Sequence, residues 1–180
     1  IYTTTAVTTR RIYTLMHDAY GWSITNEIPL VVVDAMRVGP ISGITGAPGQ
    51  GEFYIARYAS HTLQFKPGRD VALLNAMLNV IVAEGMVDIQ YVQAHTEGFE
   101  SLKAKVADFT PEKMEPVCGI PAATIREVAR LYARSERSLI FWGMGISQHT
   151  HGTDNARCLI ALALVTGQVG RPGTGLHPLR

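Results

Sequence analysis

An uninterrupted run of apolar, mostly β-branched residues constrains the fold of this chain most strongly: Ile28-Pro29-Leu30-Val31-Val32-Val33, followed by Asp34. A strand with one wet face alternates apolar and polar residues, whereas this run has no polar face. It therefore predicts a strand that is covered on both sides, as in a parallel sheet with helices above and below. Asp34 would stand at the carboxyl end of that strand.

Strand and helix signals alternate along the rest of the chain. Short strands are predicted at residues 62–65 and 138–142. Helices are predicted at residues 12–19, from Asp70 as N-cap to Gly85, in short pieces over 88–99, after Thr110-Pro111, after Ile120-Pro121, and through 159–164. The last of these helices is apolar nearly all round, which predicts that it is buried, and a glycine-rich final loop follows it. The alternation predicts the α/β class, with a Rossmann-like, mostly parallel sheet and flanking helices.

The amino-acid composition indicates that this fold is part of a larger protein. Of the 180 residues, 47% are hydrophobic and only 17% are charged, against about 25% charged in ordinary soluble domains. This excludes disorder and suggests that another part of a larger protein covers much of the surface. The chain opens on Ile1 without a start Met and stops at Arg180 within a glycine-rich stretch. We therefore expect a fragment of a larger, multidomain protein.

The charge and cysteine content exclude several classes of partner. A net charge of +1 provides no basic stripe for nucleic acid. The two cysteines, Cys118 and Cys158, form neither a disulfide framework nor a CxxC pair, so a reducing, cytoplasmic location is expected. The longest apolar run, residues 159–165, is far shorter than the roughly 20 residues of a membrane span. We expect no nucleic acid and no membrane span.

A glycine- and proline-rich stretch separates the first strand from the later elements. Residues 38–51 contain five glycines and two prolines, which no regular element tolerates. Loops of about fourteen residues are usually functional or mobile, so a binding loop and a simple linker both remain open.

Three strand-end segments are candidates for binding a ligand, because open parallel sheets bind ligands beyond the carboxyl ends of their strands. The first is Asp34 with Arg37. The second is the turn from Gly68 to Asp70 at a helix N-terminus, where backbone N–H groups receive anions. The third is the segment from Gly143 to Gln148, whose glycines permit close backbone approach. Each has a purely structural alternative, namely a local turn bond, an ordinary helix cap or a strand end.

Catalytic groups are not evident. His149 and His151 form an H-x-H pair, but a metal site needs three or four converging ligands, and histidines on a polar loop are usually solvated. Cys118 has no base at a fixed spacing, and no GxSxG motif is present. We assign neither catalytic residues nor metal ligands to this chain.

From about residue 57 onward, four segments resemble one enzyme family. They are Lys66-Pro67-Gly68-Arg69-Asp70-Val71-Ala72-Leu73-Leu74-Asn75-Ala76, Thr96-Glu97-Gly98-Phe99-Glu100, Trp142-Gly143-Met144-Gly145 with Gln148, and Leu164-Val165-Thr166-Gly167-Gln168-Val169-Gly170-Arg171-Pro172-Gly173-Thr174-Gly175. Their order and spacing resemble the catalytic alpha subunit of the molybdenum- or tungsten-dependent bis-pyranopterin formate dehydrogenases. The resemblance implies that residues 58–180 form an incomplete molybdopterin-oxidoreductase cofactor-binding α/β domain. It also implies oxidation of formate to carbon dioxide, or the reverse.

The resemblance implies roles for individual residues toward a bis-molybdopterin guanine dinucleotide cofactor with Mo or W. Gly68 and Asp70 would contact the nucleotide end. Gly143, Met144, Gly145 and Gln148 would lie along the cofactor, and the loop with Gly173 and Gly175 would lead towards the metal. The family's metal-ligating cysteine or selenocysteine and its iron–sulfur motifs are not in this sequence. We therefore expect no catalysis by these residues alone, with the rest of the catalytic subunit and iron–sulfur or flavin subunits as partners.

Residues 1–57 carry a second resemblance. Thr14-Leu15-Met16-His17-Asp18, the strand run to Asp34, Arg37-Val38-Gly39-Pro40-Ile41-Ser42-Gly43 and Gln50-Gly51 are similar to the alpha subunit of thiamine-diphosphate-dependent 2-oxoacid:ferredoxin oxidoreductases. One interpretation is a partial α/β segment, residues 1–57, fused from another enzyme. In the other, Val32-Val33-Asp34 with Arg37 is the formate dehydrogenase strand and nucleotide-binding end, and the glycine-rich stretch is an insertion. For the function, a fragment of a thiamine-diphosphate-dependent oxidoreductase is the second hypothesis, and a non-catalytic α/β nucleotide-binding module or an artificial chimera is the third.

Overall fold

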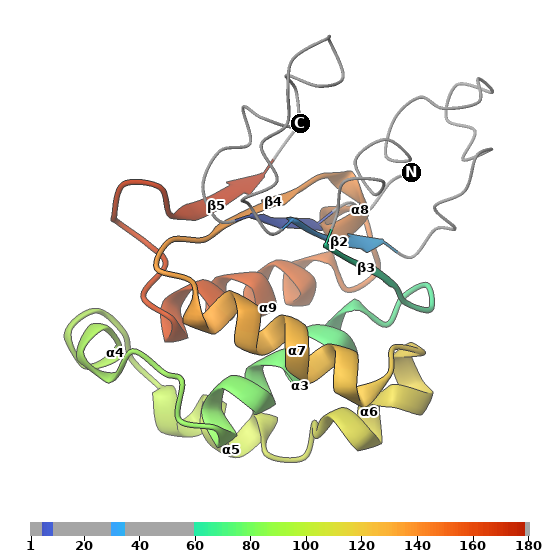
Figure 1. The fold of residues 1–180 in the computed structure, drawn as a ribbon, viewed down its shortest axis with the longest axis horizontal. Helices are drawn as coiled ribbons and strands as arrows, with labels where there is room; N and C mark the ends of the chain where they lie inside the picture. Colours follow the sequence, from blue (N-terminus) through green and yellow to red (C-terminus); the bar gives the residue numbers. More distant parts are fainter. Residues whose placement is uncertain (1–4, 9–29, 35–59, 179–180) are drawn as a thin grey trace, which may run out of the picture.

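The computed structural model describes residues 5–8, 30–34 and 60–178, which form one sheet with helices packed against it (Figure 1). The sheet has the order β3-β2-β1-β4-β5. Its strands are β1 (Thr5–Thr8), β2 (Leu30–Asp34), β3 (His61–Gln64), β4 (Leu139–Trp142) and β5 (Gly175–Pro178). The strands predicted at 28–34, 62–65 and 138–142 are thereby confirmed, and the α/β class with them.

The sheet is mixed rather than simply parallel. β2 pairs in parallel with β3, and β4 with β5, whereas β1 runs antiparallel to both β2 and β4. Among the described strands, four therefore share one direction and the central strand opposes them. The four-residue sequence of β1, Thr-Ala-Val-Thr, was too short to predict a strand. Its antiparallel pairing needs none of the crossover helices on which the expectation of a mostly parallel sheet was built. The expected final loop is also partly wrong, because its last residues form β5.

The described helices are α3 (Asp70–Ala83), α4 (Ile89–His95), α5 (Phe99–Val106), α6 (Pro111–Cys118), α7 (Ala122–Arg134), α8 (Met144–Ser147) and α9 (Gly152–Val165). Figure 1 shows α3, α7 and α9 together on one side of the sheet. The Thr110 hydroxyl caps α6 by accepting a hydrogen bond from the Lys113 N–H at 3.4 Å, as the Thr-Pro start predicts. Asp70, expected as the N-cap of α3, is instead its first helical residue, and Arg69 occupies the cap.

The core lies between the sheet and the first layer of helices. Leu63 of β3 and Ile140 of β4 are buried against apolar residues of α3, α7 and α9. The predicted buried face of α7 is confirmed at Ile125, Val128, Ala129 and Tyr132. Helix α9 departs from expectation at Ile160, which is 41% exposed although the whole run 159–164 was predicted to be buried.

A buried glutamine, Gln168, connects the turn that follows α9 to the turn that precedes β4 by two hydrogen bonds. Gln168 is 1% exposed. Its side-chain oxygen accepts a hydrogen bond from the Ser138 N–H at 3.0 Å, and its amide nitrogen donates to the Ser135 carbonyl at 2.9 Å. The turn after α9 is thus held to the turn that begins β4.

Several sequence-based predictions lie outside the described residues. They are the helix at 12–19, Arg37 and the glycine-rich stretch at 38–51. The boundary at residue 57 stays a prediction. Within the part of the chain that the structure describes, no helix has the length and apolar character to cross a membrane.

Candidate functional site

The pairing register brings the ends of three strands to one edge of the sheet. Asp34 lies opposite Gln64 at the ends of β2 and β3. Ala6 of β1 pairs with Val32 on one side and Phe141 on the other, so β4 ends at the same edge. The turn after β3 and the segment after β4 consequently leave the sheet at the same edge, with β2 and β1 between them, as expected for ligand-binding segments of an α/β fold.

A hollow of about 350 Å³ opens beside these segments. One wall comes from the turn after β3 and the first turn of α3, and the facing wall from the residues between α8 and α9 and the start of α9. The loop before α6 and the end of α6 supply the rest. The lining residues are Gly68, Arg69, Asp70, Val71, Ala72, Phe109, Val117, His149, Thr150, His151, Asp154 and Asn155.

The Asp70 carboxyl is the chemically unusual group in this hollow. The residue is only 3% exposed, and its Oδ1 has no hydrogen-bond partner among the described residues. Burial raises the pKa of Asp70, and its own backbone N–H and the nearby His149 offset only part of that effect. A buried carboxylate oxygen without a donor costs free energy. A ligand that presents N–H groups to this oxygen would recover that cost.

The wall opposite Asp70 is held in place by close packing and hydrogen bonds where α8 meets α9. The Trp142 indole N–H donates to the Ser147 hydroxyl at 3.2 Å, and the Asn155 amide donates to the Ile146 carbonyl at 3.1 Å. At Gly152 a Cβ atom would lie 2.0 Å from the Ser147 carbonyl oxygen, so only glycine permits this approach. The junction fixes the position of His149 at the hollow.

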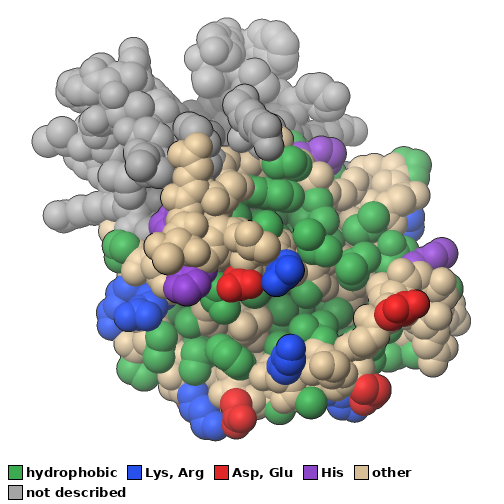
Figure 2. Space-filling model, turned by 180° about the vertical axis from the view of Figure 1, so that it is seen from behind, with side chains coloured by type: hydrophobic (Ala, Val, Ile, Leu, Met, Phe, Trp, Pro, Cys, Tyr) green, Lys and Arg blue, Asp and Glu red, His purple; other side chains and the backbone are tan. Residues whose placement is uncertain are grey.

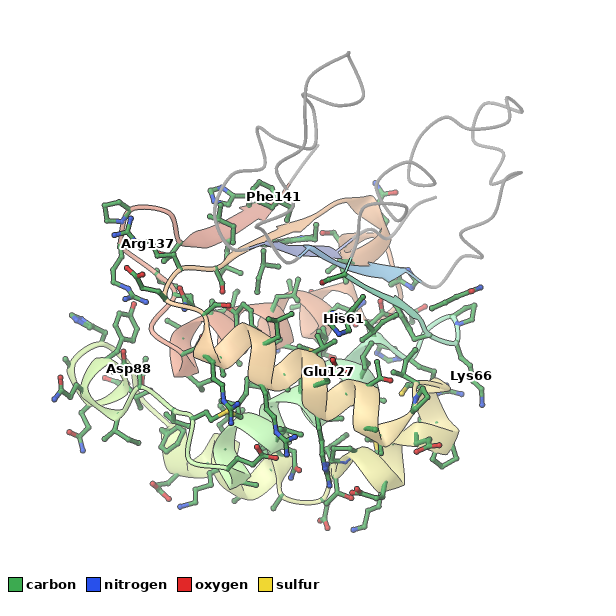
Figure 3. All side chains as sticks on the ribbon, in the orientation of Figure 1. His61, Lys66, Asp88, Glu127, Arg137 and Phe141 are labelled. Carbon is green, nitrogen blue, oxygen red and sulfur yellow. The ribbon has the colours of Figure 1, made fainter. Side chains whose placement is uncertain are left out.

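Lys66 holds the remaining wall to the turn after β3. Its backbone N–H donates to the Cys118 carbonyl and its ammonium to the Pro116 carbonyl, both at 2.8 Å. Its aliphatic stem packs on Gly119, where a Cβ would lie 3.3 Å from the Lys66 Cγ. Figure 3 shows Lys66 on the loop beyond β3. The end of α6, including Val117, is thereby kept beside Gly68.

The predicted site residues do not all meet in this hollow. Gly68 and Asp70 line it. Gly143, half-buried, and Gly145, buried, leave the same edge of the sheet but do not line the hollow, and Gln148 is exposed. For Met144 the structure gives the backbone position in α8. The backbone of Asp34 ends β2 at this edge.

Gly173 and Gly175 lie elsewhere. Gly175 pairs with Leu139, the first residue of β4, and therefore sits at the opposite edge of the sheet. Both glycines have positive φ, 80° and 136°, which accounts structurally for their residue type. From this edge β5 runs towards the carboxyl end of β4, its parallel neighbour in the described sheet.

The sequence reasoning missed five polar residues of the hollow: His149, Thr150, His151, Asp154 and Asn155. The H-x-H pair was interpreted as solvated loop, because no third ligand lies near it in the sequence. The available signal was its position directly after the strand-end segment that closes with Gln148. Within the described residues, no group of three or more His, Cys, Asp or Glu side chains is arranged to hold a metal ion.

Comparison with known proteins agrees with the resemblance drawn from the sequence. The family model for molybdopterin oxidoreductases matches residues 25–180, a range that includes β2. The F420-dependent formate dehydrogenase subunit alpha of Methanocaldococcus jannaschii is 45% identical over 118 residues, 66% of this chain and 18% of its own length. Formate dehydrogenase H of Escherichia coli is 42% identical over 164 residues, 89% of this chain and 22% of its own length.

A solved structure shares the fold. Acetylene hydratase from Pelobacter acetylenicus matches with a TM-score of 0.64 at 22% identity, over 79% of this chain and 18% of that one. The chain thus spans about a fifth of the length of the relatives it matches. Since the match begins at residue 25, β2 belongs to the matched region, which favours the interpretation of Val32–Asp34 as a strand of the same domain. The chain belongs to the molybdopterin oxidoreductase family, and formate dehydrogenases are among its relatives.

Proposed function

We propose that this chain holds the guanine nucleotide end of a molybdopterin guanine dinucleotide cofactor within a formate-dehydrogenase-like catalytic subunit. The observation that carries the proposal is the Asp70 carboxyl, which lines the hollow and has one buried oxygen, Oδ1, without a partner among the described residues. Guanine presents two adjacent donors, its ring N–H and its amino group, and an ionised carboxylate accepts both. Adenine presents a donor beside an acceptor and lacks that match.

The remaining residues of the hollow fit a nucleotide. The backbone at Gly68, which has a positive φ of 71° and no side chain, allows close approach beside the N-terminus of α3. Phe109 and Val117 offer apolar surface, and Arg69, His149 and His151 offer donors for oxygen atoms of an anion. We assign Gly143, Met144, Gly145 and Gln148, with Asp34 and Arg37, to the neighbouring length of the cofactor.

The wider proposal concerns the whole enzyme. The complete domain is a Rossmann-like unit. The loop with Gly173 and the first residue of β5, Gly175, lead the chain on towards the metal. When bound, a bis-molybdopterin guanine dinucleotide with Mo or W supplies the two-electron redox chemistry. This chain's residues bind and orient the nucleotide end. By the names of its relatives, the substrate is formate. Iron–sulfur clusters and electron-transfer subunits belong to other parts of a cytoplasmic enzyme.

The nucleotide site is tested by calorimetric titration of the purified chain with GDP and with ADP. GDP is expected to bind and ADP to bind at least about tenfold more weakly, since a mismatched edge leaves Asp70 unpaired. Asp70→Asn replaces one acceptor by a donor and should weaken GDP binding by about tenfold or more.

Asp154→Asn is the matched control, because Asp154 lines the same hollow but is exposed and lies 3.5 Å from Arg157. It should change GDP affinity by less than about threefold. Equal binding of GDP and ADP, or an Asp70→Asn variant that binds GDP like the wild type, would refute the site. Thiamine diphosphate, included in the same series, tests the alternative enzyme class suggested for residues 1–57.

A further inference from the structure

A second hollow, mostly apolar, lies between α9 and the link from α4 to α5. Its volume is about 230 Å³. Most of its lining is apolar and includes Val92, Phe99, Leu102, Ile160 and Leu164. Ile160 is one of three large apolar residues that are substantially exposed in the described chain, at 41%. Figure 2 shows hydrophobic side chains gathered over α9 on this rear face.

Two charged side chains lie at the border of this hollow. Glu97 and Arg157 are among its lining residues, and both are exposed. Arg157 already pairs with Asp154 on its own helix, at 3.5 Å. An apolar centre with charged groups of both signs at its border is the composition of a contact surface that excludes water at its middle.

Most of a related catalytic subunit lies outside the region that matches this chain and is available to cover this surface. This chain spans about a fifth of each, and only 17% of its residues are charged. A hollow of this size accommodates one or two side chains. An independent subunit needs roughly 1,000 Å² or more of buried surface for a specific contact. A segment of the same polypeptide needs far less, because its effective concentration is high without any further contact.

We propose that the hollow beside Ile160 is the seat for an apolar side chain from the remainder of the catalytic subunit's own polypeptide. The α9–α5 face is then an internal contact between this domain and the rest of that subunit. This inference rests on the family and on the hollow, not on nucleotide binding. A failure of GDP to bind would therefore leave it standing.

The test is thiol labelling in the complete catalytic subunit that contains this chain. Ile160→Cys places a thiol at the hollow, and Ile89→Cys places one at a comparable apolar residue, 48% exposed, on α4 outside it. Cys118 and Cys158 are buried and stay unlabelled in the folded domain. A maleimide is added to each folded and urea-unfolded variant, and mass spectrometry of the peptide carrying the new thiol gives the rates.

Covering by the same polypeptide predicts that the new thiol of Ile160→Cys reacts at least about a hundredfold more slowly folded than unfolded, at every subunit concentration and without other subunits. The new thiol of Ile89→Cys should react within about tenfold of its unfolded rate. Fast labelling at position 160, or equal protection at both positions, would overturn the proposal. Protection that develops only with electron-transfer subunits, or only as the subunit is concentrated, would overturn it too, in favour of a partner or a second copy.

Discussion

Gly152, at the start of α9, lies against the carbonyl of Ser147, at the end of α8, so closely that a Cβ would stand 2.0 Å from that oxygen. Gly152→Ala must push the two helices apart at the wall that carries His149. We expect a loss of about 1–3 kcal/mol in the free energy of unfolding, as for other overpacked sites. Urea denaturation followed by circular dichroism measures it.

The neighbouring exposed residue Thr153 provides the control. Thr153→Ala changes the same helical turn without a backbone clash and should alter stability by less than about 0.5 kcal/mol. A Gly152→Ala variant as stable as the wild type would mean that α8 and α9 are not packed as the structure has them.

Asp70 predicts an unusual dependence of stability on pH. Because burial raises its pKa in the folded chain above 3.8, the folded state binds the proton more tightly than the unfolded state. Stability contributed by this group is therefore lost as pH rises from 3.8 through the raised pKa. Asp70→Asn removes that loss.

Without nucleotide, Asp70→Asn should accordingly melt at a higher temperature than the wild type at pH 7, with a difference that shrinks towards pH 4. Differential scanning fluorimetry across this range measures it, and Asp154→Asn again serves as control. A lower melting temperature of Asp70→Asn at pH 7 would contradict the buried, unpartnered carboxylate. A binding residue that lowers the stability of the unliganded protein, as Asp70 is expected to do, is typical of functional sites.

Gln168 should be essential to the sheet because it satisfies two backbone groups at once, the buried Ser138 N–H and the partly buried Ser135 carbonyl. Gln168→Ala leaves the Ser138 N–H and the Ser135 carbonyl unpaired, and should lower the free energy of unfolding by about 2 kcal/mol or more. Gln148→Ala, at an exposed position, should change it by less than about 0.5 kcal/mol. Chemical denaturation of both variants gives the comparison, and equal stabilities would disprove this role.

The two thiols should be unreactive in the folded chain. Burial raises the pKa of Cys118, and burial with the nearby Asp154 and Asp70 raises that of Cys158 to about 11. Few thiolates are then present at pH 8, so reaction with a chromogenic disulfide should be slow until urea is added. Rapid reaction of either thiol in the native chain, assigned with Cys158→Ala, would show that the core around α9 opens readily.

The purified chain should not oxidise formate. Within the whole sequence no iron–sulfur cysteine motif is present, and the residues proposed here bind a nucleotide rather than touch the reacting atoms. A dye-reduction assay with formate measures turnover, with the complete catalytic subunit as positive control. Turnover by this chain alone would place catalytic groups among its residues and refute that expectation.

Sequence patterns predicted a helix or strand correctly where the element is determined by residues close together in the chain. The Thr110-Pro111 start, the buried face of α7 and the strand before Gly143 all depend on residues close together in sequence, and the structure has each of them. Strand β1 depends instead on hydrogen bonds to strands far along the chain. Its own four residues contain no signal of that pairing.

The candidate site divides in the same way. Gly68 and Asp70 were found because a glycine turn before a helix is a local pattern. His149 joins them only because α8 turns the chain back after β4, and no spacing in the sequence reveals that return. Ile160 shows the converse error, since an apolar helix indicates burial but not which part of the protein supplies the cover.

The antiparallel strand at the centre of the sheet has a consequence for how this domain is assembled. β1 contains Thr5–Thr8, yet one of its two neighbours, β4, is Leu139–Trp142. The middle of the sheet therefore closes only after well over a hundred residues have been synthesised, and the loop it closes makes folding slow. Until then β1, β2 and β3 form at most a three-stranded sheet in which β1 is an open edge, a species on which chaperones act and from which aggregates grow.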